Sequence, residues 1–162
     1  MSETSRYQNA GLVAGAVSFS LVSGALWFQY FGGLPPCEMC HWQRWPHIAA
    51  ALFGLVGGGL LAAGLLPKGA ARPLALLAIA GLGFSGLIGV YHAGIEWGLW
   101  EGLTSCAGLG FEPGALAGPD AFRVVRCDVA AWRFLGISLA GYNALISLGV
   151  AGLCLALLKR RR

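Results

Sequence analysis

Long uninterrupted runs of apolar residues dominate the pattern of this chain. Four runs, at about residues 10–31, 46–66, 73–91 and 134–158, come close to or exceed the ~20 residues that a helix needs to cross a membrane. Transmembrane strands would instead show ~10-residue segments with alternating apolar and polar positions, and these runs do not alternate. The pattern therefore predicts an all-α membrane protein with four transmembrane helices.

Composition supports this prediction and excludes other classes. The chain has 162 residues, of which 57% are apolar and only 11% are charged, whereas soluble domains carry about 25% charged residues. An ordinary soluble domain, a coiled coil and a disordered chain are all excluded. The spans are rich in small residues, which let helices approach closely in lipid, so we expect one compact four-helix bundle over residues 1–162.

The first apolar run is expected to be a retained helix. It is longer than the 7–15-residue core of a secretory signal, and the segment before it carries one Arg and one Glu.

Basic residues are distributed unequally between the two sides of the predicted bundle. Seven of the eleven lie before the first span, between the second and third, or after the fourth, namely Arg6, Lys68, Arg72, Lys159, Arg160, Arg161 and Arg162. The other connections hold the remaining four, together with six of the seven acidic residues. The positive-inside rule then puts both termini in the cytoplasm. The loops at about residues 32–45 and 92–132 would face outward.

Cysteines gather in the two outward loops. Cys37 and Cys40 lie in the first, and Cys106 and Cys127 lie in the second. Disulfides form and persist outside the cytoplasm, and the orientation was assigned from basic residues alone, so the two observations support each other independently. Cys154, within the fourth span, is expected to be a small packing residue.

The Cys37–Cys40 pair has the C-x-x-C spacing of redox sites. At a helix N-terminus such a pair often has a lowered thiolate pKa, because the partial positive charge there favours the anion. Pro46 suggests that a helix begins nearby. Arg44 follows Cys40 by one helical turn and could stabilise a thiolate or a reduced anionic cofactor. It could equally be an interfacial arginine whose head group reaches toward water.

Other interpretations of these cysteines remain open at this point. Cys37–His41 reads as C-x-x-C-H, the attachment motif of c-type haem, although it abuts a span and leaves the second pair unexplained. A zinc site built from the four outward cysteines is possible, but residues 106 and 127 are too widely spaced for a usual zinc pair. Cys106 and Cys127 could simply staple a loop, or could relay electrons to the first pair by thiol–disulfide exchange.

Several sequence blocks resemble the disulfide bond formation protein B (DsbB) family. The segment from Pro36 to Arg44 looks like the family's P-C-x-x-C-x-x-x-R block. Tyr91-His92 matches its Y-H-x-G segment, and residues 132–136 resemble its W-x-F-L-G block. The blocks occur in the family's order and cover all four spans and both loops.

The resemblance implies a membrane thiol:quinone oxidoreductase of the bacterial inner membrane, with periplasmic redox loops. A Cys106–Cys127 disulfide would oxidise a periplasmic thioredoxin-like, DsbA-like partner through a transient mixed disulfide at Cys106. Cys127 would pass the electrons on by attacking Cys37. Cys40 would then face a membrane quinone, ubiquinone or menaquinone.

The resemblance also assigns supporting roles. Arg44 would match the family's quinone-site arginine, and His92 would match a histidine near the quinone. His41 and His47 have no clear role in the resemblance, and no metal is expected.

Two other functions compete with this one. A vitamin K epoxide reductase-like enzyme is disfavoured because its C-x-x-C usually lies on a later helix than its loop pair. A c-type haem-binding protein would show a haem spectrum. A thiol-stapled membrane scaffold would show disulfides that react with neither a quinone nor a partner.

Overall fold

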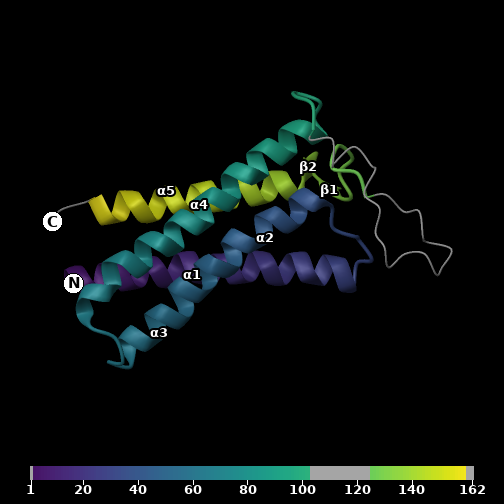
Figure 1. Ribbon diagram of the computed structural model, residues 1–162. Helices are drawn as coiled ribbons and strands as arrows, with labels where there is room; N and C mark the ends of the chain where they lie inside the picture. Colours follow the sequence, from purple (N-terminus) through teal and green to yellow (C-terminus); the bar gives the residue numbers. More distant parts are fainter. Residues whose placement is uncertain (1, 103–124, 160–162) are drawn as a thin grey trace.

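Four long helices make up the computed structural model, which describes residues 2–102 and 125–159 (Figure 1). The all-α membrane bundle predicted from the sequence is confirmed. In chain order the elements are α1 Glu3–Tyr30, α2 Glu38–Ala51, the π-helical turn η1 Leu52–Val56, α3 Gly57–Ala62, the 3₁₀ turn η2 Lys68–Ala70, α4 Ala71–Glu96, strands β1 Arg133–Phe134 and β2 Ile137–Ser138, and α5 Leu139–Lys159.

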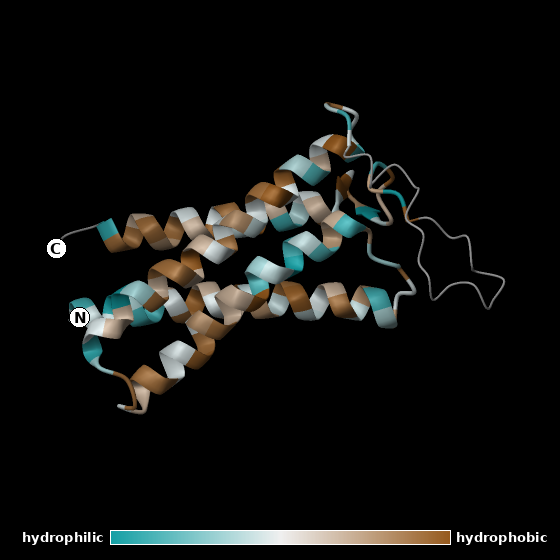
Figure 2. Ribbon diagram, viewed as in Figure 1, coloured by the Kyte–Doolittle hydropathy of each residue, from teal (hydrophilic) through white to brown (hydrophobic). Residues whose placement is uncertain are grey.

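The helices are suited to lipid. The helical stretches Glu3–Tyr30, Glu38–Ala62, Lys68–Glu96 and Leu139–Lys159 are each long and apolar enough to cross a membrane. Figure 2 shows hydrophobic residues along their length and hydrophilic residues near the two ends, with further hydrophilic residues inside α2. The termini and the α3–α4 connection lie at one end of the bundle, while the start of α2 and the β1–β2 hairpin lie at the other (Figure 1).

All four helices differ in extent from the predicted spans, and the first begins at Glu3 and not near residue 10. The second helix begins at Glu38 and not near residue 46, because Cys37 caps it, and Pro46 lies inside the helix. The third continues to Glu96, so His92 lies on a helix and not in the loop predicted to begin there. The fourth begins at Leu139 because residues 133–138 form a tight antiparallel hairpin.

The hairpin turn explains why α5 cannot start earlier. Leu135 has φ of 49° and Gly136 has φ of 81°. Two successive positive φ angles suit a two-residue hairpin turn and interrupt a right-handed helix. Trp132 stacks on Phe134 beside this turn and also contacts Phe28 of α1, with ring centroids 6.0 and 5.2 Å apart.

Small residues hold the helices together. The central apolar cluster consists mostly of alanines from different helices, with Ile79, Leu82 and Cys154. Gly15 of α1 and Gly54 of η1 meet so closely that a Cβ on Gly54 would lie 2.3 Å from the carbonyl oxygen of Gly11. Helices in lipid gain from such close backbone approach. The result is a tight bundle whose hairpin end carries the cysteine pair.

Candidate active site

The C-x-x-C pair forms the first turn of α2. Cys37 is the N-cap, and its sulfur accepts a hydrogen bond from the backbone N–H of Cys40 at 3.3 Å. The two sulfurs are 2.9 Å apart, and both cysteines are free thiols. The hydrogen bond between the two sulfurs, together with burial, raises the pKa of the Cys37 thiol above its ordinary value. Cys37 is therefore the thiol that keeps its proton.

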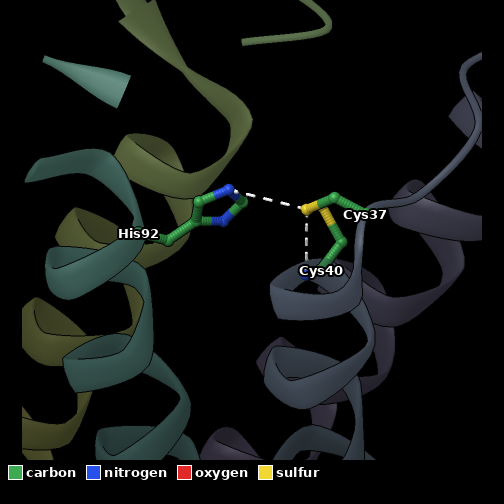
Figure 3. Close-up of side chains that lie close together, drawn as sticks. All are labelled: Cys37, Cys40 and His92. Atoms are coloured by element: carbon green, nitrogen blue, oxygen red, sulfur yellow. Dashed lines mark hydrogen bonds between the residues drawn. The ribbon is translucent and has the colours of Figure 1, made fainter. Parts of the chain in front are cut away.

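His92 of α4 faces this pair. Its Nε2 lies 3.6 Å from the Cys37 sulfur, and the residue is only 2% exposed. Figure 3 shows the imidazole pointing at Cys37 from the neighbouring helix. Glu96, one turn further along α4, places Oε1 3.8 Å from the same nitrogen. The structure thus brings a histidine that the sequence placed at the end of a span directly to the cysteines.

Cys127 lies in the same buried cluster as Cys37. Cys127 is 1% exposed and Cys37 is 5% exposed, and they pack together with Met39 and Ile95 while Cys40 packs against this cluster. Cys127 is disulfide-bonded, and its backbone hydrogen-bonds the His92 ring. Cys106, the expected partner-facing cysteine, lies outside the described residues. Of the predicted site residues, Cys37, Cys40, Cys127 and His92 are therefore brought together.

A cavity of about 220 Å³ opens beside Cys40. Its walls come from α1, α2, α4, α5 and the segments near Pro35 and Trp132, and its polar lining is supplied by Ser20, Cys40, Gln43, Arg44, His47, His92, Glu96, Tyr142 and Asn143. A second hollow of about 290 Å³ lies on the side of residues 125–131, and Cys37, Cys40 and His92 line it too. Cys40 therefore borders both spaces.

Arg44 lines the first cavity one turn after Cys40. One of its terminal nitrogens donates to Oε1 of Gln29 on α1 at 2.6 Å. Its Nε is buried and has no hydrogen-bond partner. A half-buried guanidinium on the wall of a cavity is positioned to bind an oxygen atom of a ligand through a terminal N–H. Gln29 helps to fix the head group there.

Polar residues that the sequence interpretation passed over form the inner wall of this cavity. Gln43 and His47 on α2 and Asn143 on α5 line it, and hydrogen bonds join them to one another and to Ser85 on α4. Polar side chains inside a membrane span are costly and mark function by default. That signal was present in the sequence, because Asn143 interrupts an apolar run and Gln43 and His47 flank Arg44.

The described residues also contain one group able to hold a metal, formed by Cys37, Cys40 and His92 with donor atoms within 4.8 Å of one another. A histidine ligand normally donates its second ring N–H to an acceptor. Here Nδ1 of His92 instead faces the amide nitrogen of Gln43 at 2.9 Å. This surrounding favours redox chemistry of the thiols over metal binding.

Comparisons with known proteins agree with the geometry. The family described as "Disulfide bond formation protein DsbB" matches residues 7–157. A "Disulfide bond formation protein B" of Aromatoleum aromaticum is 28% identical over 152 residues, which cover 91% of this chain and 89% of that protein. One from Xanthomonas oryzae pv. oryzae is 28% identical over 137 residues, covering 81% and 78%. No solved structure matches the chain. With four membrane-spanning helices around a buried cysteine pair, this multi-pass protein belongs to the DsbB family of disulfide bond formation proteins.

Proposed function

We propose that this protein is a thiol:quinone oxidoreductase that reoxidises a thioredoxin-like dithiol oxidase outside the cytoplasmic membrane. The observation that carries the proposal is the packing of Cys127 against Cys37 in one buried cluster. A loop cysteine held at a C-x-x-C pair provides the contact that thiol–disulfide exchange requires. A loop disulfide that served only as a staple would have no need of this contact.

The loop pair takes electrons first. The partner's thiolate attacks Cys106 and forms a mixed disulfide, which releases Cys127 as a thiolate. Cys127 then attacks the Cys37 sulfur of an oxidised Cys37–Cys40 pair and releases Cys40 as the leaving thiolate. The partner's second thiolate then resolves the mixed disulfide and frees Cys106, which attacks Cys127 and frees Cys37. One disulfide is opened for each disulfide formed, so no outside oxidant is needed until the Cys37–Cys40 dithiol is reoxidised.

Cys40 is suited to the last step because it borders the cavity. Arg44 supplies a fixed positive charge one turn away, which attracts a negatively charged sulfur or a reduced anionic ligand. Phe28, Leu34 and Trp132 line the cavity and give it apolar walls near the reacting sulfur.

The cavity also fits the head group of a quinone. Its volume of about 220 Å³ suits one substituted ring and lies below the ~300–1,000 Å³ of pockets that enclose a whole drug-sized ligand. The guanidinium of Arg44, on the cavity wall, provides a donor for a ring oxygen. A quinone held there would be the two-electron acceptor for the Cys37–Cys40 dithiol, whose disulfide would re-form. Which quinone is used, ubiquinone or menaquinone, depends on the membrane.

Location and orientation follow the same proposal. The hairpin end, with Cys37 and Cys127, faces the periplasm, and both termini face the cytoplasm of a bacterial inner membrane. The placement of the termini and the α3–α4 connection at one end supports this orientation (Figure 1), as do the basic residues Lys68 and Arg72 on that connection.

The test uses the purified full-length chain in lipid vesicles, with a reduced DsbA-like oxidase and a soluble quinone analogue. We expect quinone reduction in step with oxidation of the partner. Cys37→Ser and Cys40→Ser should abolish quinone reduction, and Cys106→Ser should abolish the mixed disulfide with the partner. Cys154→Ala is the matched control, because Cys154 lies in the apolar core cluster away from the site, and it should retain full turnover.

Wild-type turnover in any of these three outward cysteine variants would contradict the relay. A protein whose disulfides react with neither quinone nor partner would instead be a scaffold.

A further inference from the structure

A chain of hydrogen bonds crosses the interior of the bundle and ends at the cysteines. The amide of Asn143 on α5 meets Oε1 of Gln43 on α2 at 2.7 Å. The amide nitrogen of Gln43 meets Nδ1 of His92 on α4 at 2.9 Å. Nε2 of His92 faces the Cys37 sulfur at 3.6 Å. Four residues from three helices thus form one continuous polar path in an otherwise apolar membrane bundle.

Backbone carbonyls fix which end of each amide points where. The Gln43 amide nitrogen lies 3.2 Å from the carbonyl oxygen of Met39. The Asn143 amide nitrogen lies 3.2 Å from the carbonyl oxygen of Ser85. A carbonyl oxygen only accepts hydrogen bonds, so flipping either amide would set two acceptors against each other. Both NH₂ groups therefore stay where they are, and the Gln43 NH₂ donates to His92.

The histidine tautomer follows from this donation. Because Nδ1 of His92 accepts a hydrogen bond from Gln43, a neutral imidazole must carry its proton on Nε2. That N–H faces the Cys37 sulfur (Figure 3) and is shared with the backbone of Cys127, which also accepts from the ring. The Cys37 sulfur already accepts the backbone N–H of Cys40. With donors on two sides, the Cys37 S–H is directed at the remaining neighbour, the Cys40 sulfur at 2.9 Å.

We infer that Gln43 and Asn143 are positioning residues of a one-way hydrogen-bond chain, Asn143 to Gln43 to His92 to Cys37, whose last donor points at the Cys40 sulfur. Every member donates in the same direction, so each bond polarises the next. The function of this chain rests on the proposed relay, since Cys40 is the sulfur that faces the cavity and must carry negative charge there. His92 acts in it as a donor and not as a general base.

The tautomer can be measured directly. In the full-length reduced protein in lipid nanodiscs, labelled with ¹⁵N-histidine, the two ring nitrogens of His92 report whether each is protonated. The chain has three histidines, so single replacements assign the signals. We expect His92 to show a bare Nδ1 and a protonated Nε2. A protonated Nδ1 in the wild-type protein would overturn the inference, whatever the variants do.

Gln43→Glu reverses the first donation while keeping the side chain's shape. A carboxylate only accepts, so Nδ1 of His92 should become protonated, and an unchanged bare Nδ1 would count against the role of Gln43. Asn143→Ala removes the donor that holds Gln43 Oε1, and the His92 signals should then report both tautomers. Unchanged signals would remove Asn143 from the chain. Gln8→Glu, the same change on α1 outside the site, is the matched control and should leave His92 as it is.

A second measurement separates positioning from mere packing. Alkylation of Cys40 in the reduced full-length protein, followed by mass spectrometry against pH, reports formation of its thiolate. Gln43→Leu removes the donor without adding a charge and should move the midpoint upward by about half a pH unit to one unit, the effect of losing about one hydrogen bond, whereas Gln8→Leu should not move it. A fixed midpoint in Gln43→Leu would refute the directional chain even if activity fell. If His92 shows the expected tautomer but the protein does not reduce quinone, the proposed relay is refuted and the hydrogen-bond chain is not.

Discussion

Gly54 offers a sharp test of how closely the helices are packed. It lies in the π-helical turn η1, opposite α1. A Cβ there would lie 2.3 Å from the carbonyl oxygen of Gly11, and 2.7 Å from Cα and 2.8 Å from the nitrogen of Gly15. All three neighbours are backbone atoms, which cannot rotate away as a side chain could. Gly54→Ala must therefore push α1 and η1 apart.

The size of the effect follows from these distances. Ordinary contact begins at about 3.4 Å, so the carbonyl of Gly11 must recede by about 1.1 Å. Overpacking of this kind destabilises by about 1–3 kcal/mol, and we expect the upper half of that range because the backbone of a whole helix must move. The same movement would stretch the contact between Gln29 of α1 and Arg44 of α2. Gly54→Ala should therefore also weaken binding at the cavity.

The assay is unfolding in mixed micelles, followed by circular dichroism against increasing denaturing detergent. Gly59→Ala is the matched control, since no atom lies within 4 Å of a Cβ at that position, and helix propensity alone should stabilise it by up to about 1 kcal/mol. We expect the Gly54 variant to unfold at lower detergent than wild type and the Gly59 variant at the same concentration or higher. Equal midpoints for the two variants would show that the helices are free to separate, and the packing argument would fail.

Three further predictions concern the site. Arg44→Lys keeps the charge but loses the planar donor set, so the KM for a quinone should rise about tenfold, and a KM equal to wild type would mean that charge alone suffices. Because the pKa of Cys37 is raised, the folded reduced protein still holds this proton at a pH where the unfolded chain has lost it. The free energy of unfolding should therefore fall as the pH rises above about 9. Detergent unfolding at several pH values measures this, and a midpoint detergent concentration that does not change with pH would contradict it. Cys40→Ala removes the hydrogen-bonding side chain that is the first cause of that raised pKa, so alkylation of Cys37 should proceed at lower pH than in the wild-type protein, as mass spectrometry would detect.

The sequence predicted the helical bundle because membrane spans leave a strong signal. Twenty apolar residues in a row have few alternatives in lipid, and charge placement adds orientation. The helix starts were harder to predict. Pro46 favoured a start nearby, whereas the cap at Cys37 let α2 begin earlier and carry the proline inside it. A cysteine is not among the usual capping residues, so residue preferences gave no indication of it.

The site was predictable only where residues are neighbours in sequence. Cys37, Cys40 and Arg44 share two turns of one helix, and their spacing predicted their proximity. The hydrogen bond between Gln43 and Asn143 joins residues one hundred positions apart, and no local pattern encodes which helices pack together. The proximity of His92 to the cysteines could not be predicted from sequence spacing, and only the family resemblance connected them.

The cap at Cys37 also links the folding of α2 to the electron affinity of the pair. A sulfur caps the Cys40 N–H best when it is a separate thiol or thiolate, and a sulfur tied into a disulfide is a weaker acceptor. The first turn of α2 is therefore more firmly closed when the pair holds electrons. A protein that stabilises its dithiol state is a stronger oxidant. In the proposed relay, the helix that anchors this protein in the membrane would thus help to draw electrons out of the partner, and the exchange rate of the Cys40 amide hydrogen would report the redox state.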